Sequence, residues 1–377
     1  MLRTVLAAAL LSSLAALPAQ AQGPPGQVES IMTEAGPVSV MRVADRIPRP
    51  WAMTFLPDGR MLVTSKPGKL LLMTMDDEPP VEVTGTPTVF AQGQGGLLDV
   101  ALDPDFAQNG YVYLSFARPG PDGSAATAVG RGRMEADSLA GFETLFTQEP
   151  YVTGPNHFGS RIAFGPDGML YLTMGERFQF DPAQDPTNHL GTLVRLMPDG
   201  SVPDDNPFVG EDGQDEIWSY GHRNVESAAF DPRTGDLWIA EMGPLGGDEL
   251  NRIQRGANYG WPTVSWGINY DGTEIPDPPT RPEFADAAAQ WTPVISPSGM
   301  AYYDGTVFPE WTGSFFIGSL SRQGVVRVAV DGDTVTEQEV MVLGERIREV
   351  EAGPDGYVYV LTDQEEGQLW RLEPLGE

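Results

Sequence analysis

IAFGPDGMLYLTMGE, residues 162–176, predicts a β-hairpin. A short apolar segment leads into Gly-Pro-Asp-Gly, and a segment of alternating apolar and polar residues follows. Period-two alternation is typical of β-strands, and Pro, Asp and Gly are typical turn residues. The two segments are therefore expected to pair as neighbouring antiparallel strands.

The same hairpin pattern occurs six times along the chain. The other five copies are TFLPDGRMLVTS from Thr54, VALDPDFAQNGYVYLSFA from Val100, AAFDPRTGDLWIAE from Ala228, GMAYYDGTVFPEWTGSFFIGS from Gly299 and VEAGPDGYVYVLTD from Val350. Successive copies start 46 to 71 residues apart, which is enough for a four-stranded sheet and a loop. Six such units with almost no helical periodicity predict an all-β fold, a six-bladed β-propeller. A β-sandwich is the alternative, but it rarely repeats one hairpin signature this often.

Three long irregular segments interrupt the repeat, at residues 177–190, 198–214 and 266–298. Loops of this length are usually functional when they are ordered. We therefore expect a propeller with long loops on its top face. The third segment contains Trp266 and Tyr270, and we expect it to lie near the mouth of the axial channel, where it would shape substrate access.

The first 21 residues have the features of a secretory signal peptide. Arg3 is followed by an apolar run from Val5 to Leu17 and by the small-residue site Ala19-Gln20-Ala21. The run is shorter than the ~20 apolar residues that span a bilayer. We therefore expect residues 1–21 to be a signal peptide, residues 22–377 to form a single propeller domain, and the mature protein to be periplasmic without membrane insertion.

The composition excludes several classes of function. The chain has 53 acidic against 23 basic residues and a formal net charge of -30, which would repel nucleic acid phosphates. It has no cysteine, so disulfides and thiolate chemistry are excluded. Lys66 and Lys69 are the only lysines. An anion site is therefore expected to depend on arginines, which bind carboxylates bidentately.

His157 is the histidine best placed for chemistry. It lies in the turn-rich loop Gly154–Gly159, directly before a predicted strand, where its side chain can face the axial channel. An imidazole titrates near neutral pH and can accept a proton from a hydroxyl group. A structural role is the alternative for any loop histidine, and it is our expectation for His189 and His222.

Two further clusters suit an anionic ligand. Residues 215–262 carry Arg223 and Asn224 near acidic loop ends, so cations, amides and carboxylates lie close in sequence. Arg346 and Arg348 alternate along a predicted strand and should face the same side. Two arginines on one face are costly unless an anion lies between them. Salt bridges to neighbouring glutamates are the alternative.

Five motifs in order resemble the glucose/sorbosone dehydrogenase family, from about Arg46 to Arg371. They are WAMTFLPDGRMLVTS, GQGGLLDVALDPDF, NHFGSRIAFGPDGMLYLTMGE, residues 215–262 and RIREVEAGPDGYVYVLTD. The family comprises soluble quinoproteins that oxidise aldoses to lactones with pyrroloquinoline quinone (PQQ) and calcium. The resemblance implies a small-molecule aldose substrate, both cofactors and an electron acceptor that the sequence does not identify.

The resemblance also implies roles for individual residues. His157 corresponds to the catalytic base, and Arg223 would act beside the reacting carbonyl and bind the cofactor. The other implied cofactor contacts are Gln94, Asn224, Tyr270, Arg322, Arg346 and Arg348. The implied calcium ligands are the carbonyls of Gly243 and Pro244 with Asp248 nearby, and Glu249 with the Tyr259 carbonyl at a separate structural site.

The chain departs from the family pattern at two places. GHRN is followed by Val225, Glu226 and Ser227 instead of proline, glutamine and glycine, and a carboxylate facing the pocket would repel an anionic cofactor. No lysine follows Ser319, and Arg322 is expected to take its place. Two rival functions stay open: a propeller lactonase with a metal-activated water, and a non-catalytic sugar-binding propeller.

Overall fold

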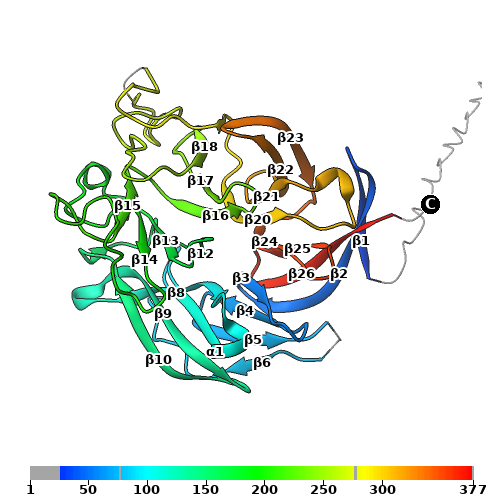
Figure 1. Cartoon of the computed structure of the whole chain (residues 1–377). Helices are drawn as coiled ribbons and strands as arrows, with labels where there is room; N and C mark the ends of the chain where they lie inside the picture. Colours follow the sequence, from blue (N-terminus) through cyan, green and yellow to red (C-terminus); the bar gives the residue numbers. More distant parts are fainter. Residues whose placement is uncertain (1–25, 76–77, 276–277, 376–377) are drawn as a thin grey trace, which may run out of the picture.

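The computed structural model describes residues 26–75, 78–275 and 278–375. Its strands form six sheets that radiate from a common centre as the blades of a β-propeller (Figure 1). The predicted all-β, six-bladed architecture is therefore confirmed. The predicted signal peptide, residues 1–21, lies outside the described residues.

Each blade is an antiparallel sheet whose first strand is the innermost. Blade 1 contains β3 (Pro50–Phe55), β4 (Met61–Ser65), β5 (Lys69–Met73) and β6 (Val81–Val83). Blade 2 contains β7 (Leu97–Leu102), β8 (Tyr111–Pro119), β9 (Ser124–Glu135) and β10 (Ser138–Thr147), and β11 (Val152–Thr153) pairs with β9. Blade 3 contains β12 (Gly159–Phe164), β13 (Leu170–Met174), β14 (Thr192–Leu196) and β15 (Ile217–Tyr220).

The remaining blades follow the same order. Blade 4 contains β16 (Val225–Asp231), β17 (Asp236–Glu241), β18 (Asp248–Arg252) and β19 (Ala289–Trp291). Blade 5 contains β20 (Pro297–Tyr303), β21 (Ser314–Ser319), β22 (Gly324–Asp331) and β23 (Thr334–Val342). Blade 6 contains β24 (Ile347–Ala352), β25 (Val358–Thr362), β26 (Glu366–Pro374), β2 (Gly36–Pro48) and β1 (Gln27–Thr33). The described helices are short: α1 (Phe106–Asn109) and the 3-10 turns η1 (Pro121–Gly123), η2 (Asp181–Gln184) and η3 (Pro309–Trp311).

Blade 6 closes the ring because both ends of the chain contribute to it. Strand β2 pairs with β26, with Val40 opposite Leu372. The innermost strands β3, β7, β12, β16, β20 and β24 then contact one another in turn around the axis. Their first residues meet on one face, which we call the top face, and their hairpin turns lie on the opposite face. The residues that directly precede the six inner strands are thereby brought together.

The six predicted hairpins are confirmed as the inner strand pairs of the six blades. In blade 3, Asp167 accepts a hydrogen bond from the Met169 N–H at 3.1 Å. Gly168 has a φ of 76°, a conformation that glycine adopts without strain. The Asp167 side chain and the Gly168 backbone therefore stabilise the turn locally.

The long segments are not all on the top face. Residues 177–190 join β13 to β14 there, as expected. Residues 198–214 join β14 to β15 and lie on the opposite face, because β14 runs from the top face downward. The segment 266–298 reaches the top face, where Ile268 pairs with Leu245, but it then supplies β19, the outer strand of blade 4.

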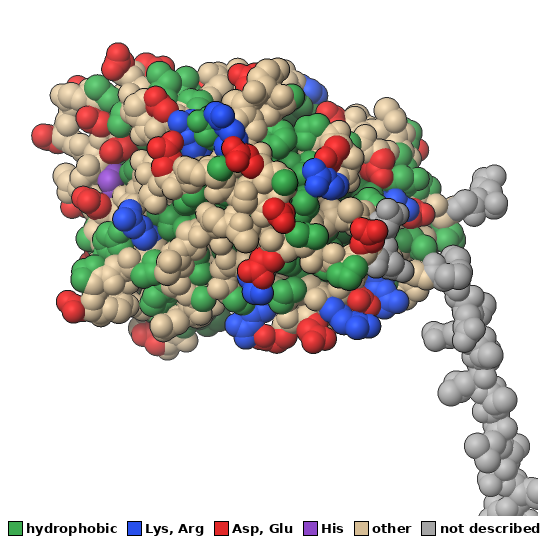
Figure 2. Space-filling model, turned by 90° about the horizontal axis from the view of Figure 1, so that it is seen from below, with side chains coloured by type: hydrophobic (Ala, Val, Ile, Leu, Met, Phe, Trp, Pro, Cys, Tyr) green, Lys and Arg blue, Asp and Glu red, His purple; other side chains and the backbone are tan. Residues whose placement is uncertain are grey.

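Apolar side chains fill the spaces between neighbouring blades. Blades 5 and 6, for example, share a core that includes Trp311, Phe316, Val360 and Trp370, each at most 2% exposed. Outside these cores, acidic and basic side chains are scattered together over the face seen in Figure 2. Among the described residues, no helix is long and apolar enough to span a membrane.

Candidate active site

His157 and Glu176 form a buried pair at the start of blade 3. The imidazole Nδ1 lies 2.7 Å from Glu176 Oε1, and the two residues are 5% and 0% exposed. A carboxylate can only accept, so the Nδ1 carries the proton. Nε2 is therefore the basic nitrogen, and it makes no hydrogen bond within the described part of the chain. A Cβ at Gly175 would lie 2.1 Å from the His157 carbonyl oxygen, so this approach requires glycine.

The environment of His157 keeps its imidazole neutral. Burial lowers its pKa, the hydrogen bond to Glu176 opposes that effect, and the charge of Arg223 lowers the pKa further. The ring contacts Phe178 at a centroid distance of 5.1 Å, and the His157 N–H donates to Gln94 Oε1 at 2.5 Å. A neutral imidazole with a free Nε2 is suited to general-base chemistry.

Arg223 lies beside this pair and is 3% exposed. Its Nη1 donates to the carbonyls of Met242 and Gly243 at 2.8 and 2.9 Å, and its Nη2 lies 3.3 Å from the Tyr270 hydroxyl. The Nε is buried and has no hydrogen-bond partner within the described ranges. Because a buried donor without a partner is costly, the guanidinium has capacity left for an anionic ligand.

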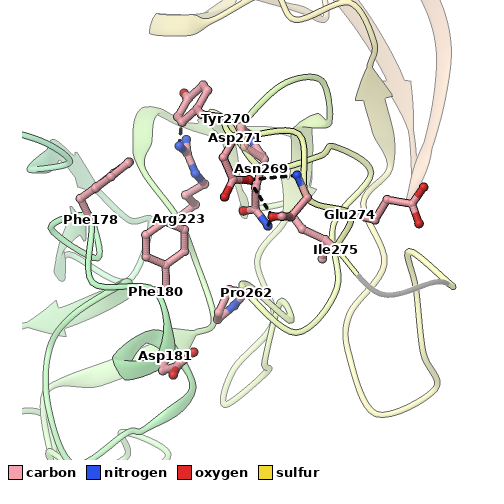
Figure 3. Close-up of a pocket in the computed structure, with 12 residues that line it drawn as sticks. Phe178, Phe180, Asp181, Arg223, Pro262, Asn269, Tyr270, Asp271, Glu274 and Ile275 are labelled. Atoms are coloured by element: carbon pink, nitrogen blue, oxygen red, sulfur yellow. Dashed lines mark hydrogen bonds between the residues drawn. The ribbon is translucent and has the colours of Figure 1, made fainter.

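An open pocket of about 560 Å³ lies next to Arg223 on the top face (Figure 3). Phe178, Phe180 and Tyr270 form aromatic walls, and Asn269 and Asp271 supply polar groups. Its volume is within the range of small-molecule sites, ~300–1,000 Å³. Aromatic faces with a few polar groups suit a sugar ring.

A second cavity, of about 370 Å³, lies on the propeller axis. Arg346 and Arg348 both line it and both hydrogen-bond Asp363, at 2.7 and 3.2 Å. Burial alone would raise the pKa of Asp363, but the two guanidinium groups hold it at about 2. The arginines therefore share a face, and in this structure the anion between them is Asp363.

Glu226 also lines the axial cavity and pairs with Arg348. Its Oε2 accepts from Arg348 Nη1 at 2.5 Å, and its Oε1 accepts from Asn224 Nδ2 at 3.1 Å. Asn224 in turn accepts the Gly159 N–H at 3.1 Å, so both ends of its amide are bonded within the protein. The carboxylate thus faces the cavity, but a buried arginine compensates for its charge.

The axial cavity contains a lysine that the sequence did not single out. Lys66, directly after β4, lines it together with Gln94. Arg322 does not: its Nη2 donates to the Pro293 carbonyl at 2.8 Å, outside the cavity lining. Lys66 of blade 1, and not Arg322 of blade 5, therefore supplies a positive charge to the axial cavity.

His157 connects the two cavities. Its backbone bonds Gln94, which lines the axial cavity, and its ring packs on Phe178, which lines the open pocket. A base in this position can act on a molecule that lies between a charged cavity and an aromatic pocket. His189 and His222 have structural surroundings instead, since both nitrogens of each ring bond within the protein.

At the first implied calcium site, the Gly243 carbonyl and the Asp248 carboxylate already accept hydrogen bonds from other protein groups. Asp248 accepts backbone N–H groups of Gly243, Ile295 and Ser296 at 2.6–2.8 Å, and burial raises its pKa to about 6. The Gly243 carbonyl already accepts from Arg223. A calcium ion bound here would share that carbonyl oxygen, which has two lone pairs, with the Arg223 guanidinium.

The second implied site fits an ion better. Glu249 and Tyr259 line a hollow of about 10 Å³, which is the size of one water molecule. Burial and the neighbouring Glu241 raise the pKa of Glu249 to about 8. A bound cation would therefore stabilise the ionised form of this carboxylate. Asn251 Oδ1 is buried without a hydrogen-bond partner among the described residues. No group of three or more His, Asp or Glu side chains arranged for a metal occurs in the described ranges, so backbone carbonyls would have to contribute.

Known proteins resemble this chain over most of its length. The family described as "Glucose / Sorbosone dehydrogenase" matches residues 47–371. The aldose sugar dehydrogenase YliI of Escherichia coli strain K12 is 44% identical over 347 residues, which cover 89% of this chain and 93% of the relative. Quinoprotein glucose dehydrogenase B of Acinetobacter calcoaceticus is 28% identical, with 85% and 84% of the two chains covered.

Solved structures of aldose sugar dehydrogenases also resemble this chain. The soluble aldose sugar dehydrogenase of Escherichia coli in its apo-form has a TM-score of 0.86 and 44% identity, covering 89% of this chain and 99% of its own. The PQQ-bound form of an aldose sugar dehydrogenase from Streptomyces coelicolor has a TM-score of 0.76 and 30% identity, covering 89% and 98%. The resemblance read from the five motifs is confirmed.

Proposed function

The chain belongs to the glucose/sorbosone dehydrogenase family, and we propose that it is a quinoprotein that oxidises aldose sugars to lactones with PQQ and calcium. The observation that carries the proposal is the position of the His157–Glu176 pair between a cavity lined by cations and an open aromatic pocket. The PQQ-bound structural relative supports the choice of cofactor.

The axial cavity has the chemistry that a tricarboxylic quinone needs. Arg346 and Arg348 would hold carboxylates, and Gln94 would offer an amide. Arg223, which lines the open pocket, has a buried Nε without a hydrogen-bond partner among the described residues. PQQ, when bound, would accept the hydride equivalent that leaves the sugar carbon. The Gly243 and Pro244 carbonyls would hold a calcium ion, and Glu249 with the Tyr259 carbonyl would hold a second, structural ion.

The catalytic work of the chain falls to three residues. His157 Nε2 accepts the proton of the sugar's anomeric hydroxyl while Glu176 keeps Nδ1 protonated and the ring oriented. Arg223 stabilises negative charge that gathers near its guanidinium. Phe178 and Tyr270 bound the pocket in which the sugar lies, and Asn269 offers it hydrogen bonds.

Turnover of the reconstituted protein tests the proposal. The protein is incubated with calcium and PQQ, and aldose oxidation is followed with an artificial dye acceptor, since the natural acceptor is unidentified. Activity that requires PQQ supports the proposal. Hydrolysis of a lactone with calcium alone would favour the lactonase instead, although the described residues show no cluster of carboxylates for a catalytic metal. No PQQ binding at any calcium concentration would leave the sugar-binding propeller.

We also propose export to the periplasm, on the strength of the signal-peptide features of residues 1–21. Cell fractionation and N-terminal sequencing of the mature protein test this. A mature protein that begins near Gln22 supports export, and an intact N-terminus in the cytoplasm would refute it.

A further inference from the structure

The axial cavity carries an excess of positive charge in a strongly acidic protein. Lys66, Arg346 and Arg348 line it against Glu226 and Asp363, which gives three positive and two negative groups, a net charge of +1. The whole chain has a formal net charge of -30. A positive cavity in such a protein points to an anionic ligand.

Lys66 is held rigidly at the junction of blades 1 and 2. Its N–H donates to the Arg49 carbonyl at 3.0 Å, and its carbonyl accepts the Leu97 N–H at 3.1 Å. A Cβ at Gly96 would lie 2.3 Å from the Lys66 carbonyl oxygen, so only glycine permits this approach. The backbone therefore fixes where the lysine side chain starts.

The Lys66 ammonium differs from the two arginines because no carboxylate is paired with it among the described residues. Its Nζ donates to the Gly93 carbonyl at 2.8 Å, whereas Arg346 and Arg348 already bind Asp363 and Glu226. An ammonium has three donors, so two remain for a ligand. Burial and the nearby Arg348 lower the pKa of Lys66, and the charges of Glu226 and Asp363 only partly oppose them, so an anionic ligand would stabilise the charged ammonium.

We propose that Lys66 is a cofactor-binding residue that donates to a carboxylate of the quinone held in the axial cavity. The inference rests on the proposed function, because it takes PQQ as the anion. Lys66 also supplies the charge that keeps the cavity wall net positive beside Glu226 and Asp363.

Equilibrium binding of PQQ tests the inference, with Lys69 as a matched control. Lys69 is exposed on β5 and pairs with Glu82 at 2.6 Å. PQQ is titrated at fixed calcium into wild type, Lys66→Gln and Lys69→Gln, and tryptophan fluorescence is recorded because Trp51 lines the cavity. Loss of one charge-assisted contact should weaken binding about tenfold or more in Lys66→Gln only. Equal affinities in all three proteins would overturn the inference and leave the proposed function standing.

Lysine acetylation gives a second readout that needs no variant. The sequence contains only two lysines, so mass spectrometry assigns each modification directly. PQQ should protect Lys66 from acetylation and leave Lys69 unaffected. Equal acetylation of Lys66 with and without saturating PQQ would overturn the inference. A wild-type protein that binds no PQQ would overturn both the inference and the proposed function.

Discussion

Glu226→Gln should destabilise the ligand-free protein and, at the same time, tighten its binding of PQQ. The Glu226 carboxylate is 5% exposed and accepts from two donors, Asn224 Nδ2 at 3.1 Å and Arg348 Nη1 at 2.5 Å. A glutamine side chain has one oxygen and one NH₂ group. In either orientation the NH₂ group meets a donor, so one of the two hydrogen bonds is lost.

The loss of stability follows from what remains around Arg348. A hydrogen bond to a charged group contributes about 1.5–3 kcal/mol. Breaking a buried ion pair outright costs about 3–5 kcal/mol, but Arg348 keeps Asp363 at 3.2 Å. We therefore expect the free energy of unfolding to fall by about 1.5–3 kcal/mol.

The gain in affinity follows from the size of the cavity. A sphere with the cavity's volume of 370 Å³ is ~9 Å across, so an anion inside lies within that distance of Glu226. Two unit charges about 8 Å apart at an effective dielectric constant of ~20 interact by about 2 kcal/mol. Removing the carboxylate should therefore tighten PQQ binding by about tenfold or more.

Urea unfolding without ligands and PQQ titration at fixed calcium measure the two effects separately. Glu310→Gln is the control, because Glu310 is exposed and forms no ion pair within the described ranges. An unchanged free energy of unfolding would refute the Glu226–Arg348 pair. Weaker PQQ binding by the Gln variant would refute electrostatic opposition between Glu226 and the cofactor.

Three further substitutions and one pH profile test other parts of the site and of the channel. His157→Ala should cut turnover about 10²-fold or more and leave PQQ affinity nearly unchanged, as measured by steady-state kinetics and fluorescence titration, and normal turnover would remove His157 as the base. Because the His157 pKa is lowered, the acid limb of the wild-type kcat/KM profile should lie below pH 6.5; a limb above that value would contradict this environment. Arg346→Ala should weaken PQQ binding roughly tenfold, and unchanged affinity would reduce Arg346 to a partner of Asp363. At the lower end of the channel, Asp99, Glu349 and Glu351 share one cation, Arg161, and burial raises the pKa of Glu349 to about 7. Burial also raises the pKa of Glu351 well above its usual value, so the protein loses stability as the pH rises above about 4.5. Glu351→Gln should therefore stabilise the protein more at pH 8 than at pH 4 in urea unfolding, and equal effects at both values would refute this.

The sequence determined the elements whose physics is local. Period-two alternation and Pro-Asp-Gly turns specify each hairpin through neighbouring residues, so the six inner strand pairs could be read without knowing how blades pack. Arg346 and Arg348 were expected on one face because they alternate along a strand, and their shared bond to Asp363 agrees. Glu176 is the last residue of the blade 3 hairpin motif, but nothing in that motif predicts its hydrogen bond to His157.

Only the tertiary structure decided which side chains meet at the axis. Ring closure brings the starts of six inner strands together, so Glu226 meets Arg348 across 122 residues and the His157 N–H meets Gln94 across 63. Lys66 enters the cavity from blade 1, while Arg322 is directed to the Pro293 carbonyl, and neither outcome has a local cause. The strand direction likewise placed residues 198–214 on the face opposite the site. Such pairings depend on the packing of one blade against the next, which no short stretch of sequence encodes.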